Sequence, residues 1–284
     1  MQGSIKERHA ATLLTRRGIA YSLGYHVRMI DYQLAVATIR KTLLALRPRL
    51  LAAYGNAPFS TKADGSLVTA LDVAVEEALK EELATVVPDA SFYGEETTHD
   101  GLASLSWLID PIDGTDAFIR GIPLCATLVA LLEHGQITLG VIDNFTTGEF
   151  YHAIRGHGAY VNGAPIHVST RPFEQSTVIL ESRTDFRNDF AYAKALVTCM
   201  SASRVAQRVL FGYDLALVAH GKVEGVICHD PYEQIWDIAP GSLLIEEAGG
   251  IVRNLRNDTY DPGNLNVIAA SHEVYRTLRA AHLV

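Results

Sequence analysis

Apolar residues in the first part of the chain recur at helical spacing. Between residues 30 and 54 they return every three or four positions, which places them on one face of an amphipathic helix. The residues on this face are Leu34, Ile39, Leu43, Leu46, Leu50 and Leu51. Residues 71–86 repeat the spacing. We therefore expect two helices near the start of the fold.

After Trp107 the apolar pattern changes to short runs that are typical of β-strands. The expected strands cover residues 107–109, 126–132, 137–143 and 149–154. Turn-forming residues separate these runs, among them His134-Gly135 and the stretch from Asn144 to Gly148. We therefore expect an antiparallel sheet that packs on the helices.

Beyond Gly163 the chain alternates between strand and helix patterns. The expected strands cover residues 176–181, 223–228 and 265–270, with another near residue 204. The expected helices cover residues around 189–201, 213–219 and 236–248. The fold class is thus expected to be α+β in the first part of the chain and α/β in the second.

These two patterns divide the chain into an α+β half, residues 29–165, and an α/β half, residues 166–284. Neither an internal repeat nor a long linker separates the halves, so we expect them to share an extensive interface. A cleft between two such halves is a natural place for a functional site.

Residues 1–28 are expected to form an N-terminal extension outside the fold. They lack the continuous apolar core of a secretory signal. Their charged side chains include Lys6, Arg8, Arg16, Arg17 and Arg28 against the single acid Glu7. Such an Arg-rich, acid-poor segment is either an organellar transit segment or the product of a start codon upstream of the true one.

The composition excludes several classes of protein. With 284 residues, 48% of them hydrophobic, the chain can bury a sizeable core. A formal net charge of -8 argues against nucleic acid or an anionic membrane as a partner, because phosphate groups attract clustered Lys and Arg. Cys125, Cys199 and Cys228 lack metal-site spacing, which favours reduced thiols in a cytoplasmic protein. No apolar stretch is long enough to span a bilayer.

The most informative motif is Asp-Pro-Ile-Asp-Gly-Thr at residues 110–115, directly after an apolar strand. Pro111 is expected to fix an extended turn, so that Asp110 and Asp113 converge on one hard cation. The carbonyl oxygen of Ile112 can join them. An isolated pair of aspartates would more simply be an Asp-rich turn with helix capping, but the complete string favours a metal site.

The same motif also has features of a phosphate site. Gly114 lets the backbone approach an anion closely. If a helix begins near Asp116, its first N–H groups and the Thr115 hydroxyl would face the phosphate.

Three weaker acidic signals lie elsewhere in the chain. Glu95 and Glu96 follow a glycine at the end of a short strand pattern, where one of them could join the aspartates. Asp237 has the position of an N-cap before an apolar helix. Asp72 lies early in the helix that follows the turn at residues 62–66. Taken singly, each is equally well explained by solvation or by helix capping.

Together, the four segments resemble the inositol monophosphatase family in their order and approximate spacing. The resemblance extends from about Met29 to the C-terminus. It implies a layered αβαβα sugar-phosphatase fold, commonly a homodimer, with magnesium as the cofactor and frequent inhibition by lithium. The partner would be a small-molecule phosphate ester rather than nucleic acid or a membrane.

Carried over by position, the resemblance implies a role for each motif residue. The magnesium ligands would be Glu95, Asp110, the carbonyl of Ile112, Asp113 and Asp237. The attacking water would be oriented by Thr115 paired with Asp72 and held in part by Glu95, and the phosphate would be bound by the amides of Gly114 and Thr115. The first half would thus bind metal and phosphate, and the second would lie on the substrate side.

This ligand set suits the chemistry of phosphate ester hydrolysis. Two Mg²⁺ ions can neutralise the phosphate oxygens, lower the pKa of a bound water and stabilise the leaving alkoxide during in-line attack. Carboxylates and a carbonyl are hard oxygen ligands, and the set contains neither His nor Cys, so Mg²⁺ is favoured over zinc.

The resemblance leaves the substrate open. We expect a small polyol phosphate of the inositol 1-phosphate type, because residues 214–216, Asp-Leu-Ala, resemble bacterial inositol monophosphatases. Residues 113–124 and 140–143 instead resemble the histidinol-phosphatase branch, whose Gly-Asp-Cys-Tyr segment is absent. Leu210 and Phe211 replace the small residues usual near the substrate alcohol.

Asp230, seven positions before Asp237, is expected at the rim of the cleft. The resemblance implies that its carboxylate faces the alcohol part of the substrate, where it could accept a hydroxyl or bind an ammonium group. A turn aspartate that caps its own backbone is the alternative.

A different class of function is a non-catalytic protein that only binds phosphate or a partner. Such relatives normally lose a metal carboxylate or the water-activating threonine, and this chain retains all of them.

Overall fold

The computed structural model describes residues 30–97, 101–182, 193–194, 197–200, 204–207, 212–229 and 233–281. From Asp31 onward the chain forms one compact unit. Nothing in this part of the chain tests the expectations for residues 1–28, and Asp230, Leu210 and Phe211 lie outside the described residues.

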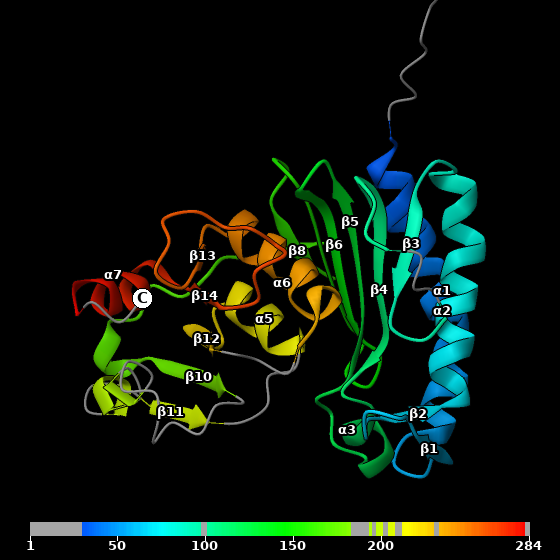
Figure 1. Cartoon of the computed structure of the whole chain (residues 1–284), viewed down its shortest axis with the longest axis horizontal. Helices are drawn as coiled ribbons and strands as arrows, with labels where there is room; N and C mark the ends of the chain where they lie inside the picture. Colours follow the sequence, from blue (N-terminus) through cyan, green and yellow to red (C-terminus); the bar gives the residue numbers. More distant parts are fainter. Residues whose placement is uncertain are drawn as a thin grey trace, which may run out of the picture. The chain divides into compact units, whose positions relative to one another are not determined.

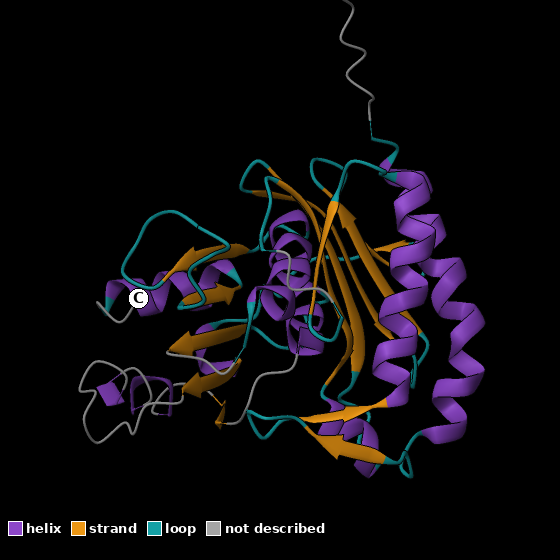
Figure 2. Ribbon diagram, turned by 45° about the vertical axis from the view of Figure 1, so that its right-hand side comes forward, coloured by secondary structure: helices purple, strands orange, loops and turns teal. Residues whose placement is uncertain are grey.

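The two expected N-terminal helices are present and pack side by side. α1 is Tyr32–Ala53 and α2 is Ala70–Val86. α1 buries Ala35, Ile39, Leu43 and Leu50, and α2 buries Val75, Leu79 and Leu83. Ile39, Leu43 and Leu50 confirm the expected face of α1, but Leu34 and Leu51, which were placed on that face, are exposed. In the sequence between the two helices, β1 (Phe59–Thr61) and β2 (Leu67–Thr69) form a hairpin that was not expected. It lies beside α3 (Thr115–Arg120) in Figures 1 and 2.

Seven strands form the larger sheet, in the order β3-β4-β5-β6-β7-β8-β9. Their bounds are Ser91–Gly94, Leu105–Asp113, Ala126–Glu133, Gln136–Asn144, Glu149–Ile154, Ala159–Val161 and Ala164–Pro165. β3 and β4 are parallel, and every later neighbouring pair is antiparallel. The strands expected at 107–109, 126–132, 137–143 and 149–154 are confirmed as parts of this sheet.

Five strands form the second sheet, in the order β11-β10-β12-β14-β13. Their bounds in chain order from β10 are Thr177–Ser182, Arg204–Gln207, Gly225–His229, Ile251–Asn254 and Val267–Ala270. β10 is parallel to both neighbours, whereas β14 is antiparallel to β12 and β13. β13 was not expected from the sequence.

Alternate residues of this second sheet face two different cores. Ile179, Val226 and Ala269 belong to the large core shared with α5 (Gly212–Ala219) and α6 (Ile235–Glu247). Val178, Ile227 and Ile268 belong to a smaller cluster with Val274 and Leu278 of α7 (His272–Ala280), a helix that the sequence analysis also missed.

The elements therefore stack in five layers, as Figure 1 shows: α1 and α2, the larger sheet, α5 and α6, the smaller sheet, and α7. This is the expected layered αβαβα arrangement. The middle helix layer sits very close to the larger sheet, because a Cβ at Gly140 of β6 would lie 2.6 Å from the Pro240 carbonyl oxygen of α6. In the described part of the chain, no helix is long and apolar enough to cross a membrane.

Candidate active site

The carboxylates of Asp110 and Asp113 come from an irregular stretch of β4. Asp110 pairs with Leu128 and Asp113 with Ala126 of β5, so three steps along β4 match two steps along β5. This β-bulge includes Pro111, whose carbonyl accepts a 2.8 Å hydrogen bond from the Thr127 hydroxyl. In a regular strand, residues three apart point to opposite faces; one extra residue restores a common face. The expected end of the strand at residue 109 was therefore wrong.

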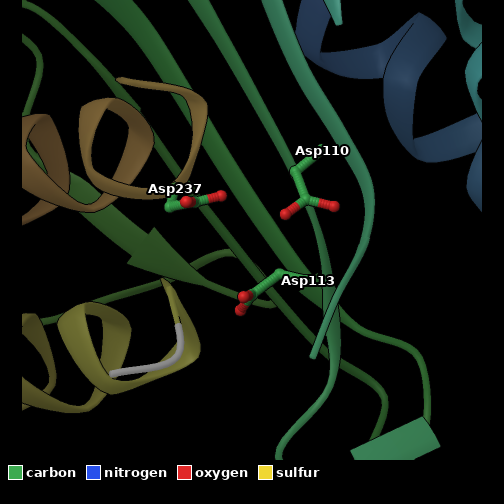
Figure 3. A group of neighbouring side chains, drawn as sticks. All are labelled: Asp110, Asp113 and Asp237. Carbon is green, nitrogen blue, oxygen red and sulfur yellow. The ribbon is translucent and has the colours of Figure 1, made fainter. Parts of the chain in front are cut away.

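Asp237 completes a cluster of three carboxylates. One oxygen atom each from Asp110, Asp113 and Asp237 lies within 4.8 Å of the others, the only such group that could hold a metal within the described residues. Figure 3 shows the side chains from β4 and α6 pointing toward one another. The Oδ1 atom of Asp110 is buried and has no hydrogen-bond partner among the described residues. A buried acceptor of this kind is costly unless a cation or donor joins it.

The position of Asp237 in its helix corrects one expectation. The N-cap of α6 is Gln234, and Asp237 stands three residues later, where its Oδ2 accepts the Gln234 amide N–H at 2.6 Å. A carboxylate here still satisfies a free donor of the first helical turn. The sequence analysis placed the helix start too late, so it assigned the N-cap to Asp237.

Asp72 holds the equivalent position in α2. Its Oδ2 accepts the Thr69 amide at 2.8 Å and the Thr69 hydroxyl at 2.6 Å. Its other oxygen lies 3.2 Å from the Thr115 hydroxyl oxygen, which also lies 3.0 Å from the Ile112 carbonyl oxygen. Burial raises the pKa of Asp72, and the hydrogen bonds from Thr69 and Thr115 oppose that rise. The structure thus brings the expected Thr115 and Asp72 together.

Gly114 lies between Asp113 and Thr115 in the chain. Its φ of +76° is a conformation that a side chain disfavours, so glycine is required where the chain turns from β4 into α3 (Thr115–Arg120). The helix begins at Thr115, one residue before the expected position.

Glu95 lies in the same cleft but outside the three-aspartate group. Its backbone N–H donates to the Ile109 carbonyl at 3.2 Å, which continues the pairing of β3 with β4. Its Oε1 is 2.7 Å from the Lys62 ammonium, which also contacts Glu96 at 2.5 Å. Glu95 and Lys62 therefore face each other across the mouth of the site, and the sequence analysis assigned no role to Lys62.

A cleft of about 940 Å³ is lined by the three aspartates together with Thr115, Glu95 and Lys62, whereas Asp72 lies behind Thr115 and does not line it. It is lined by the β1–β2 hairpin, the end of β4, the start of α3 and the first residues of α6. Glu233, which the sequence analysis did not single out, also lines it and is 5% exposed. Burial, together with a hydrogen bond to the carboxyl group of Glu181, raises the pKa of Glu233 to about 11.

The electrostatics of the cluster favour a bound cation. Burial raises the pKa values of Asp110 and Asp113 well above their usual range, and the neighbouring carboxylates raise them further. Burial raises the pKa of Asp237 to about 7, although the Gln234 amide opposes the rise. The Gly212 amide donates to Asp113 at 2.7 Å, but one neutral donor does not balance three carboxylates. A hard divalent ion would do so through oxygen ligands alone.

Comparison with known proteins identifies the family of this chain. The sequence matches the model of the inositol monophosphatase family over residues 26–284. The chain belongs to the inositol monophosphatase family. An inositol-1-monophosphatase from Mesorhizobium japonicum is 32% identical over 80% of this chain and 86% of its own length. A histidinol-phosphatase from Chlorobaculum parvum is 31% identical over 78% of this chain and 85% of its own length.

A solved structure, the extragenic suppressor protein suhB from Bartonella henselae, has the same fold as this family member. It superposes with a TM-score of 0.77 at 28% identity and covers 88% of this chain and 98% of its own. These matches confirm the expected family and fold. As an inositol monophosphatase family member with this acidic cleft, the protein is a phosphatase that acts on small phosphate esters.

Proposed function

We propose that this phosphatase hydrolyses a small polyol phosphate of the inositol 1-phosphate type with the help of Mg²⁺. The observation that carries the proposal is the cluster of Asp110, Asp113 and Asp237 beside the Thr115 and Asp72 pair. Oxygen ligands alone suit Mg²⁺. When bound, two such ions would supply charge neutralisation at the phosphate and a water of lowered pKa.

The proposed ligands are Asp110, Asp113, Asp237, Glu95 and the carbonyl of Ile112. Four of them bring negative charge, which by itself would repel a phosphate dianion. Bound Mg²⁺ ions would offset that charge, which explains how an acidic cleft could bind this substrate. Glu95 would have to exchange its 2.7 Å contact with Lys62 for the metal or its water.

Thr115 is proposed to orient the attacking water. Its hydroxyl has one proton, which it can donate to Asp72, so its oxygen remains free to accept a hydrogen bond from that water. The backbone amides of Gly114 and Thr115, at the turn into α3, are proposed to hold the phosphate.

Histidinol phosphate is a second candidate substrate. The observation that favours it is Glu233, a buried carboxyl group that lines the cleft against Glu181. The raised pKa keeps Glu233 protonated beside Glu181 at neutral pH, and a charged ammonium would let both carboxyl groups ionise, which a neutral hydroxyl would not. The matching histidinol-phosphatase from Chlorobaculum parvum supports the same candidate.

Phosphate release from a substrate panel separates these candidates. The full chain, stripped with EDTA, is assayed with and without Mg²⁺ on inositol 1-phosphate, histidinol phosphate, 3'-phosphoadenosine phosphate and fructose 1,6-bisphosphate. We expect Mg²⁺-dependent turnover with the highest kcat/KM for inositol 1-phosphate. A higher kcat/KM for histidinol phosphate than for the other substrates would establish the second candidate. Turnover that is equal with and without Mg²⁺ would overturn the metal proposal.

Asp230 is proposed to contact the alcohol part of the substrate. Asp230→Ala is then expected to raise KM severalfold for the true substrate but not for p-nitrophenyl phosphate, which lacks those groups. An equal loss on both substrates would contradict this role.

Several broader features are proposed as well. The larger sheet lies within residues 91–165 and the smaller within 177–270, which supports two halves at 29–165 and 166–284. Cys125 and Cys228 are buried thiols outside any disulfide in the described part of the chain, which supports a cytoplasmic location. A homodimer and inhibition by lithium are proposed from the family resemblance.

A further inference from the structure

A fully buried carboxylate on α2 has no part in the mechanism above. Glu76 is 0% exposed and lies one helical turn after Asp72. A buried carboxylate is costly unless donors satisfy both of its oxygens. Here Oε2 accepts the Glu96 amide at 2.8 Å, and Oε1 accepts the Thr97 amide at 3.0 Å together with the Thr97 hydroxyl. Glu76 therefore holds the two residues that directly follow Glu95.

Gly94, the residue before Glu95, lies directly against the same Glu76 carboxylate. A Cβ at Gly94 would lie 2.5 Å from Oε1 and 2.6 Å from Cδ of Glu76, far closer than such atoms can approach. The chain can pass the carboxylate at this distance only because Gly94 has no side chain. Residues 94, 96 and 97 thus all lie against Glu76, and Glu95 is fixed between them.

The same face of α2 also reaches the other side of the site. Asp72, Glu76 and Lys80 are spaced four apart, so their side chains lie one above another on the helix. Asp72 accepts from Thr115, and the Lys80 ammonium donates to the Thr97 hydroxyl oxygen at 3.0 Å. One rigid helix face thereby sets the position of the Glu95 loop relative to Thr115.

We propose that Glu76 is a positioning residue that holds Glu95 in place to bind the metal. This inference rests on the proposed function, in which Glu95 is a magnesium ligand. Groups that orient a metal ligand through hydrogen bonds are commonly worth on the order of 10- to 100-fold in metal affinity or activity. The anchoring of Glu95 through its neighbours' amides gives Glu76 a role of this kind.

Glu76→Gln is the sharpest test, because the amide has nearly the same shape. An amide presents one acceptor oxygen and one NH₂ group, so one of the two anchored N–H groups would face a donor instead of an acceptor. The matched control is Glu77→Gln, which changes an exposed glutamate on the same helix. Glu95→Gln serves as the reference for loss of the proposed ligand itself.

Two metal readouts are used. The first is Mn²⁺ binding without substrate, which is measured from the EPR signal of free Mn²⁺. The second is the Mg²⁺ concentration that gives half-maximal phosphate release. We expect Glu76→Gln to weaken Mn²⁺ binding by on the order of tenfold or more and to raise the Mg²⁺ requirement. KM for substrate at saturating Mg²⁺ should stay within about twofold of the wild type, because Glu76 binds no substrate. Glu77→Gln should match the wild type in all three.

Unchanged Mn²⁺ binding in Glu76→Gln, with only a lower Tm, would overturn the inference, since a purely structural role predicts that result. If Glu95→Gln also leaves Mn²⁺ binding unchanged, the proposed ligand role of Glu95 has failed as well. Should Glu76→Gln not fold, Thr97→Ala and Thr97→Ser decide the matter. The serine retains the hydroxyl donor, so it should bind Mn²⁺ as the wild type does, whereas the alanine should bind more weakly; equal binding by both would overturn the inference.

Discussion

The three aspartates of the cleft owe their arrangement to two local features. The β-bulge in β4 turns Asp110 and Asp113 to one face, and the first turn of α6 directs Asp237 toward them. Asp113 and Asp237 each accept one backbone amide, but the three carboxyl groups together are crowded in a buried place. A site of this kind is stable at neutral pH when a cation shares it, so the residues themselves favour metal binding.

Asp113→Asn is expected to lower kcat by on the order of a thousandfold or more, because an uncharged amide weakens metal binding and the metal supplies most of the transition-state stabilisation. The asparagine oxygen can still accept from the Gly212 amide, so the fold should survive. Phosphate release at saturating Mg²⁺ measures the loss, and circular dichroism checks the fold. A folded variant that retains most of its Mg²⁺-dependent activity would show that Asp113 is not a ligand.

Thr115→Ala is expected to lower kcat by on the order of 100-fold while Mn²⁺ affinity stays near the wild-type value, because Thr115 acts on the water rather than on the ions. Thr115→Ser, which retains the hydroxyl, is the matched control and should keep most of the activity. The two variants are compared by phosphate release and by Mn²⁺ titration. A parallel loss of Mn²⁺ affinity in the alanine variant would refute the separation of roles.

At the scale of elements, two helices start beside the site in the same way. α2 and α6 each have a carboxylate three residues after the N-cap that accepts the N-cap amide, and each carboxylate also faces the cleft groups. In each of these helices, the same carboxylate therefore both caps the start of the helix and takes part in the site. We expect the close contact of α6 with β6 at Gly140 to help set how far Asp237 stands from Asp110.

Gly140→Ala tests that contact. The added Cβ would lie 2.6 Å from the Pro240 carbonyl oxygen, so α6 and β6 must separate. Overpacking of this kind costs about 1–3 kcal/mol in the free energy of unfolding, measured by urea titration. Because α6 carries Asp237, the Mg²⁺ requirement should also rise.

Gly263→Ala is the matched control, because its Cβ would meet only the Asp261 Oδ1 atom at 3.4 Å. It should change neither stability nor Mg²⁺ requirement appreciably. If the two variants behave alike, the packing at Gly140 does not set the position of α6.

Much of the fold was readable from the sequence because its signals are local. The periodicities gave α1, α2 and most strands of the larger sheet to within a few residues, and the string at residues 110–115 identified the heart of the site. α7 was missed although Ser271 caps it and Val274 and Leu278 share its buried face, so that signal was present. The bulge in β4 and the contacts of Glu76 could not be predicted, because they depend on pairing between distant segments.

At the scale of the molecule, elements from several layers of the fold line one acidic cleft. The larger sheet supplies Asp110 and Asp113, and the turn directly after β3 supplies Glu95. α2 supplies Asp72, and α6 in the middle layer supplies Asp237. A change in the packing of the layers would therefore move Asp237, because α6 carries this residue. The acidic cluster in turn makes the stability of the metal-free protein depend on pH.

The metal-free protein should lose stability as pH rises from 3.8 to about 7. The pKa of Asp237 is about 7 in the folded protein against an ordinary value of 3.8, so between these values the folded state holds a proton that the unfolded state has lost. The free energy of unfolding then falls as pH rises through this window. Asp110 and Asp113, whose pKa values are also raised, contribute with the same sign.

The half-buried His152, whose pKa is lowered, acts in the opposite direction below pH 6.5. Because His152 is present in both proteins, comparison of the wild type with Asp237→Asn isolates the contribution of Asp237. In EDTA, the Tm of the wild type should fall more steeply between pH 5 and pH 8 than the Tm of the variant. Parallel slopes would mean that Asp237 does not titrate in this range.

The central claim is that Asp110, Asp113 and Asp237 jointly hold a divalent ion. Crystals of the wild-type protein grown with Mn²⁺ in place of Mg²⁺ test it directly through anomalous scattering. The account predicts an anomalous peak at about 2–2.3 Å from an oxygen of each of the three aspartates, the range of metal–oxygen bonds for such ions. At saturating Mn²⁺, a map with no peak among these carboxylates, or with its strongest peak elsewhere in the cleft, would contradict it.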